Sequence, residues 1–176
     1  NLKFLKNKWV NKKNPETAEA YILIGEFYER TTNFEKALHN YNLAYNQFSE
    51  DSVNSTINQT LKFKILKHKT TVLNQLQDYK KTLETSNTAI TILNNLKPSF
   101  KTRSDKLFLI ENAFPLFENS IESAFQLFNE TKDSNYIDQA FFYSEKSKST
   151  LLLESLLSSQ ATTFTNIPDH LIEKEK

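Results

Sequence analysis

The chain of 176 residues contains a single glycine, Gly25, and only four prolines. Hairpins between β-strands depend on turn residues of these kinds, above all glycine, and a sheet-rich fold is therefore disfavoured. Apolar residues instead recur every three to four positions through most of the chain, which is the period of a helix with one buried face. The sequence predicts an all-α fold.

Breaks in the apolar period predict a row of helices joined by short turns. Pro115 lies inside the helix expected at about 104–130. We expect it to kink this helix without ending it, because the apolar period continues beyond it. Ser104 or Asp105 is expected to cap the same helix. Residues 50–55 are expected to form a loop. The helices are expected at about residues 2–12, 16–31, 34–49, 56–76, 79–96, 104–130 and 136–158.

Gly25 lies in the middle of a predicted helix, where glycine costs roughly 1 kcal/mol relative to alanine. Its surroundings resemble the tetratricopeptide (TPR) repeat, a helix pair of about 34 residues with the pattern W-x2-L-G-x2-Y…A-x3-F. In such a pair the helices cross closely, and a side chain at the glycine would hold their backbones apart. A glycine that marks a kink is the alternative. The positions that match the pattern are Tyr21, Ile24, Gly25, Tyr28, Ala37, Tyr41 and Ala44.

Two further helix pairs fit this repeat less closely. The second pair sets Thr82 opposite Ala37, 45 positions further along, and the third sets Ala140 opposite Thr82, 58 positions further along. Both steps exceed the length of a TPR repeat. The resemblance therefore implies an α-solenoid of irregular TPR-like antiparallel helix pairs, in which residues 2–12 are the second helix of a preceding pair.

The C-terminal part resembles the CHAT family, in which TPR-like repeats precede a caspase-like domain. The similarity covers about residues 104–176 and rests on LIENAFPLFE at 109–118, YIDQAFFYSEKSKSTLLLESLL at 136–157 and IPDHLIEKE at 167–175. It implies a TPR-like helical repeat domain at 1–159 and a linker at 160–176 toward a C-terminal CHAT-type domain. Because the chain contains no methionine, we expect an excised segment whose targeting signals cannot be judged.

No catalytic constellation is recognisable in this sequence. The chain contains no cysteine, and its three histidines lack metal-ligand spacing. We interpret His39, His68 and His170 as structural. The histidine and cysteine on which CHAT peptidase activity depends would belong to the following domain, so the resemblance implies a cysteine peptidase only for the full-length parent. We expect no enzyme activity, no cofactor and no metal in this chain.

The charge balance constrains the class of partner. The net charge is +1, from 22 basic and 21 acidic residues, whereas binding to nucleic acid usually needs a basic surplus. The longest apolar runs are far shorter than the ~20 residues of a membrane span. We therefore expect a cytoplasmic protein whose partner is a protein or a peptide, and not a nucleic acid or a membrane. The parent's own C-terminal domain is one such partner.

The TPR resemblance also implies which side chains face the concave groove of the repeats. These positions are mostly acidic in the first pair and partly basic in the second, which suits a partner segment of mixed charge. A solvated helix face is the simpler explanation of the same charges. We expect an interaction or regulatory module; the alternative is a regulator whose groove senses a small peptide and changes curvature. The implied groove residues are Glu19, Ile22, Glu26, Glu29, Lys64, Lys67, Thr71 and Asn74.

Overall fold

The computed structural model describes residues 13–48, 55–99 and 102–163. These ranges contain helices and turns but no β-strand, which confirms the predicted all-α fold. The elements are α2 (Pro15–Arg30), α3 (Phe34–Tyr45), α4 (Thr56–Gln75), α5 (Tyr79–Leu96), the short 3-10 helix η2 (Lys97–Ser99), α6 (Arg103–Thr131) and α7 (Asn135–Thr163).

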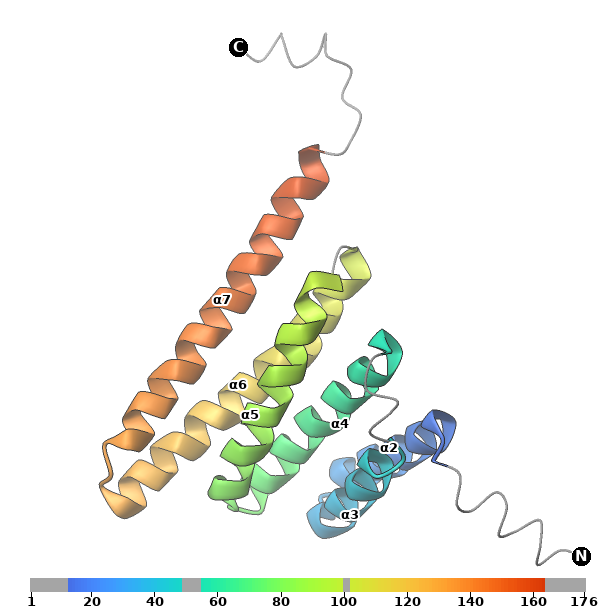
Figure 1. Ribbon diagram of the computed structural model, residues 1–176. Coiled ribbons are helices and arrows are strands. Elements are labelled where there is room, and N and C mark those ends of the chain that lie inside the picture. Colours follow the sequence, from blue (N-terminus) through green and yellow to red (C-terminus); the bar gives the residue numbers. More distant parts are fainter. Residues whose placement is uncertain (1–12, 49–54, 100–101, 164–176) are drawn as a thin grey trace, which may run out of the picture.

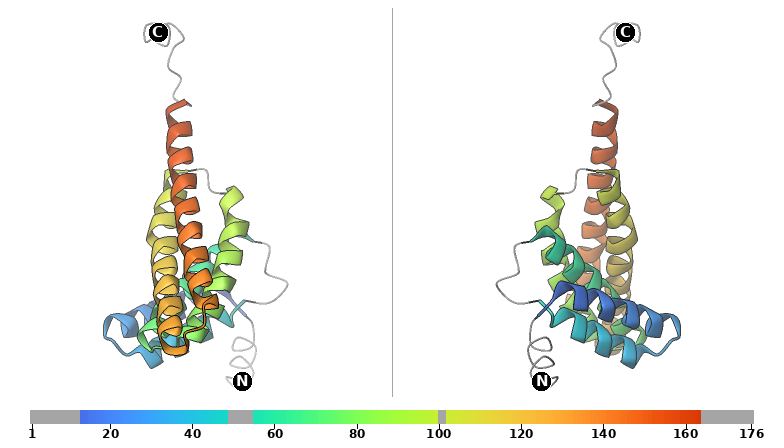
Figure 2. Two further views of the ribbon diagram at one scale, coloured as in Figure 1. Left: turned by 90° about the vertical axis from the view of Figure 1, so that its left-hand side faces the viewer. Right: turned by 90° about the vertical axis from the view of Figure 1, so that its right-hand side faces the viewer.

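The helices form three pairs that lie side by side in chain order (Figure 1). α2 packs on α3, α4 on α5 and α6 on α7. Neighbouring pairs meet where α3 contacts α4 and α5 contacts α6, and the first helices of the pairs also touch, α2 with α4 and α4 with α6. Figure 2 shows that α7 extends past the ends of the other helices. The contacts between first helices bring side chains from all three pairs together.

Most helix boundaries lie within one or two residues of the predicted ones, and 79–96 agrees at both ends. α3 is shorter than predicted, since it ends at Tyr45. α7 is longer than predicted and continues to Thr163, so the first residues of the predicted linker, 160–163, are helical. No proline or glycine interrupts the chain before Pro168, and the helix therefore has no local reason to stop at 158. The predicted helix at 2–12, residues 50–54 of the loop and the linker from 164 lie outside the described residues.

α6 begins with a capping box. Thr102 is the N-cap, its hydroxyl accepts a hydrogen bond from the Asp105 backbone N–H at 3.2 Å, and the Asp105 carboxylate accepts one from the Thr102 N–H. The predicted cap at Ser104 or Asp105 is therefore wrong, although Asp105 supplies the second half of the box. Pro115 lies inside α6, and the helix continues past it as predicted. The kink stays a prediction.

The turns within the first two pairs have the same geometry at positions 45 apart. Thr32 and Gln77 have positive φ angles of 57° and 61°. The next residues, Asn33 and Asp78, cap the second helices with their side chains. Their own N–H groups donate to a carbonyl five residues back, at 2.9 and 3.0 Å, which is the Schellman arrangement. This match supports the alignment of the two pairs at a step of 45.

Gly25 is buried in α2, beside the fully buried ring of Tyr41 from α3. The absence of a side chain at Gly25 makes room for this ring, and not for the backbone of the second helix as the sequence suggested. The equivalent positions of the second pair, 45 residues on, hold Thr70 and Ser86, both fully buried. In the second pair, Thr70 is thus larger than the equivalent Gly25, and Ser86 is smaller than the equivalent Tyr41.

The other TPR-like positions of the first pair are mostly in the core. Ala37 and Ala44 are fully buried, and the half-buried rings of Tyr21 and Tyr28 pack against the same cluster. Ile24 departs from the pattern, because 43% of its surface is exposed.

α4 is the central helix of the core. One apolar cluster fills the space between α2, α3 and α4, and the other lies between α4, α5, α6 and α7. α4 contributes Ile65 and Val72 to the first cluster and Phe63 and Leu66 to the second. Burial on both sides fixes how α2 and α6 lie against α4.

Candidate partner-binding cleft

A cleft of about 410 Å³ opens between the first helices of the three pairs, and we name it the charged cleft. Three acidic and three basic side chains line it, together with one histidine and one asparagine. They are Glu26, Glu29 and Arg30 from α2, Lys64, Lys67 and His68 from α4, and Glu111 and Asn112 from α6.

The helical period brings these side chains to one place. Glu26 and Glu29 lie three residues apart on α2, and Lys64, Lys67 and His68 have the same three-to-four spacing on α4. The acidic strip of the first pair lies beside the basic strip of the second, as expected. Nζ of Lys64 is 2.8 Å from Oε1 of Glu26, and so the two strips form an ion pair with each other.

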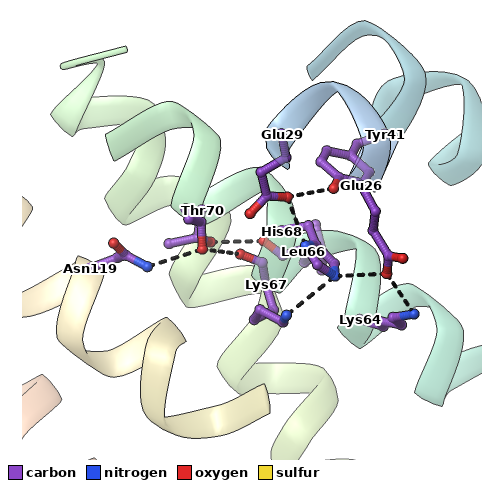
Figure 3. Close-up of polar contacts among 10 residues, drawn as sticks. Glu26, Glu29, Tyr41, Lys64, Leu66, Lys67, His68, Thr70 and Asn119 are labelled. Carbon is purple, nitrogen blue, oxygen red and sulfur yellow. Dashed lines mark hydrogen bonds and ion pairs between the residues drawn. The ribbon is translucent and has the colours of Figure 1, made fainter. Parts of the chain in front are cut away.

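His68 lies between the two carboxylates of α2 (Figure 3). Its Nδ1 is 2.9 Å from Oε2 of Glu29, and its Nε2 is 3.3 Å from Oε1 of Glu26. The Tyr41 hydroxyl donates to the same Glu29 oxygen at 2.5 Å. The rings of Tyr41 and His68 are stacked, with their centroids 5.1 Å apart. This network joins α2, α3 and α4.

When His68 is neutral, Lys67 determines which ring nitrogen carries the proton. Its Nζ is 3.2 Å from Nε2 of His68, and a charged ammonium group can only donate. Nε2 therefore accepts from Lys67, and Nδ1–H donates to Glu29. Glu26 then takes its hydrogen bond from Lys64.

The charged groups of the network perturb one another's pKa values. Burial alone would raise the pKa of Glu29, but hydrogen bonds from His68 and Tyr41 outweigh it and lower this pKa. Burial would likewise raise the pKa of Glu26, but the hydrogen bond and charge of Lys64, together with other nearby positive charge, outweigh it and lower this pKa. Burial and the Glu29 carboxylate raise the pKa of Tyr41. Burial lowers the pKa of Lys67 more than the nearby carboxylates raise it. Lys67 is therefore a cation that has lost hydration without a full electrostatic compensation.

Thr71 and Asn74 bind α6 and do not line the charged cleft. Nδ2 of Asn119 donates to Oγ1 of Thr71 at 3.1 Å, and Oδ1 of Asn119 accepts from Nδ2 of Asn74 at 3.0 Å. Thr71 and Asn74 lie 45 positions after Glu26 and Glu29. Equivalent positions of α2 and α4 therefore contact the first helix of the next pair. The contact of α2 with α4 uses charged groups, whereas the contact of α4 with α6 uses neutral ones.

The prediction that Ile22 faces a partner is wrong. Only 2% of its surface is exposed, because it packs in the cluster between α2, α3 and α4. Glu19 is exposed and borders a smaller hollow, which shares only Lys64 with the lining of the charged cleft. Of the eight predicted groove residues, the cleft therefore brings together the following four: Glu26, Glu29, Lys64 and Lys67.

The contacts of His68 could not be inferred from the sequence. It is 39 positions from Glu29, and no helical period connects residues on different helices at that distance. His39 is exposed, and His170 lies outside the described residues. Among the residues that the structure describes, no group of three or more His, Cys, Asp or Glu side chains is arranged to hold a metal ion.

The described helices include none with both the length and the apolarity to cross a membrane. Comparison of the chain with protein-family models, with curated proteins and with solved structures finds no match. The TPR and CHAT resemblances therefore rest on the motifs of this sequence.

Proposed function

We propose that this chain is a protein-interaction module, an α-solenoid of irregular TPR-like pairs that forms the N-terminal arm of a CHAT-type protein. The recurrence of structure at a step of 45 supports the repeat. The turns at Thr32 and Gln77 match, and the buried Ala44 corresponds to the buried Ala89. The contacts of α2 with α4 and of α4 with α6 also use equivalent positions.

The charged cleft is the proposed binding site, and its unpaired charges are the observation that carries the proposal. Glu26 and Glu29 are already held by Lys64, His68 and Tyr41. Within the described ranges, Arg30 and Glu111 make no side-chain hydrogen bond or ion pair, and Lys67 bonds only to a histidine nitrogen. Arg30 and Lys67 can therefore bind an anionic group of a ligand, and Glu111 can bind a cationic group.

The ligand that fits these charges is a protein segment that carries both signs. An acidic side chain of the segment would bind between Arg30 and Lys67, and would restore to Lys67 the stabilisation that burial removed. A basic side chain would bind Glu111. Charge matching of this kind provides specificity more than affinity. The segment belongs to another protein or to the parent's own C-terminal domain.

Selection of peptides from a random displayed library on the immobilised chain tests this proposal. We expect selected peptides to contain both acidic and basic residues and to raise the melting temperature of the chain. Their binding should be lost in Lys67→Ala and weakened in Arg30→Ala. It should persist in Lys148→Ala, which removes an exposed lysine on α7. Peptides that bind all four proteins equally would show that the charged cleft is not the site.

The CHAT part of the proposal has a separate test. The coding sequence that follows residue 176 should specify a caspase-like domain with a histidine and a cysteine. A different downstream sequence would refute the CHAT assignment without affecting the peptide experiment.

A further inference from the structure

α2 carries an exposed apolar stripe. Leu23, Ile24 and Phe27 are 65%, 43% and 61% exposed, and Ala20 is exposed one turn before them. The spacing of these four residues places them on one face of the helix. We name them the α2 stripe. Figure 1 shows that α2 and α3 lie at the end of the row of pairs, so no described helix follows on this side.

The equivalent positions of α4 are covered. They lie 45 residues further on and are Ile65, His68, Lys69 and Val72. Ile65 and Val72 are fully buried in the cluster that α4 shares with α3. His68 stacks on the Tyr41 ring of α3, and the Lys69 ammonium lies over the Tyr45 ring of α3, 5.5 Å from its centroid. On α4 this face is therefore the contact with the helix that precedes it in the chain.

We infer that residues 2–12 of this chain cover the α2 stripe as α3 covers α4. The segment ends close to Pro15, where α2 begins, and so it can fold back along α2. A helix over 2–12 would be about 16 Å long, whereas the stripe from Ala20 to Phe27 extends about 10 Å. The apolar residues of the segment recur at helical spacing; they are Leu2, Leu5, Trp9 and Val10.

Charge favours this occupant over a second copy of the chain. Residues 1–12 contain four lysines and no acidic residue. α2 contains four glutamates, Glu16, Glu19, Glu26 and Glu29, and one basic residue, Arg30. The N-terminal segment thus brings positive charge to an acidic helix, whereas pairing of two copies through α2 would bring acidic helices together.

Trp9 is the only tryptophan of the chain, and its fluorescence reports directly on the proposed contact. In the folded full chain we expect a blue-shifted emission and weak quenching by acrylamide. Phe27→Asp should shift the emission to the red and increase the quenching constant several-fold. Its matched control is Phe141→Asp on α7, where the phenylalanine is 66% exposed. This variant should leave both signals unchanged, and the far-ultraviolet circular dichroism of both variants should show that the described helices persist.

Three results would overturn the inference. One is a Trp9 that acrylamide quenches in the folded chain as strongly as in urea. Another is an equal response of Trp9 to Phe27→Asp and Phe141→Asp. The third is a blue shift that disappears on dilution while sedimentation shows a dimer separating, which would assign the α2 stripe to a second copy.

Discussion

The ring of Tyr41 occupies the space that a side chain at Gly25 would need. A Cβ atom built on Gly25 would lie 2.5 Å from Cε1 and 2.7 Å from Cδ1 of this ring. Tyr41 has little freedom to move, because it is fully buried, donates a hydrogen bond to Glu29 and stacks on His68. The contact of α2 with Tyr41 of α3 therefore explains why a glycine lies in the middle of α2.

Gly25→Ala is expected to lower the free energy of unfolding. Overpacking costs about 1–3 kcal/mol, which exceeds the gain of roughly 1 kcal/mol in helix propensity. In a Tyr41→Ser background, which reproduces the small residue of the second pair, the same substitution should stabilise the chain by up to ~1 kcal/mol. Urea unfolding of the four proteins measures both effects. A stabilising Gly25→Ala in the otherwise unchanged chain would contradict this explanation.

His68→Ala is expected to destabilise the chain by about 1–3 kcal/mol, since it leaves the half-buried Glu29 with one hydrogen bond fewer. Lys148→Ala is the comparison, because it removes a lysine that pairs with Glu145 while 67% exposed. Exposed pairs are worth about 0–1 kcal/mol, and this variant should be nearly neutral. Equal losses in thermal unfolding would show that the cleft network contributes no more than a surface pair.

Glu26 and Glu29 should make stability decline in acid. Their pKa values in the folded chain lie below 4.5, so the unfolded chain binds more protons as the pH falls through this region. Their contribution is therefore fully present above pH 4.5 and is lost as the pH falls through the lowered pKa values. Glu29→Gln should flatten the acid limb of a stability–pH curve. A curve of Glu29→Gln parallel to that of the parent chain would exclude this contribution.

Asn119→Ala should weaken the contact between α6 and α4. It removes the side chain that binds both Thr71 and Asn74, and we expect a loss of about 1–3 kcal/mol. Asn129→Ala, at an exposed position of the same helix, controls for helix propensity. Native-state hydrogen exchange should show faster opening of α6 only in Asn119→Ala; the same exchange rates in both variants would mean that the bridge is dispensable.

The N-cap of α6 should matter more than that of α4. Thr102→Ala breaks the capping box and should cost about 0.5–2 kcal/mol. Ser55 holds the same position before α4 but makes no side-chain capping bond, so Ser55→Ala should change stability little. Comparable losses in urea unfolding would refute this distinction.

The sequence predicted the helices well because their ends are determined locally. Asp78 caps α5 through its own backbone neighbours, and the positive φ of Gln77 closes the preceding turn. The end of α7 was missed because residues 159–163 carry neither a breaker nor a strong cap.

The cleft was predicted only in part. The charges of Glu26 and Lys64 indicated neighbouring strips of opposite sign, which the structure contains. Ile22 was placed in the groove by a repeat pattern, but its burial depends on how closely α4 packs on α2. His68 was missed for a similar reason, since its contacts depend on the packing of three helices and not on its place in one of them.

The two junctions between first helices differ in the forces that hold them. α2 meets α4 through ionised side chains, including a Lys64 that is 37% exposed, whereas α4 meets α6 through the amide of Asn119. Dissolved ions screen the first kind of contact and hardly affect the second. Rising ionic strength should therefore weaken the ion pairs between α2 and α4 more than the amide contacts between α4 and α6.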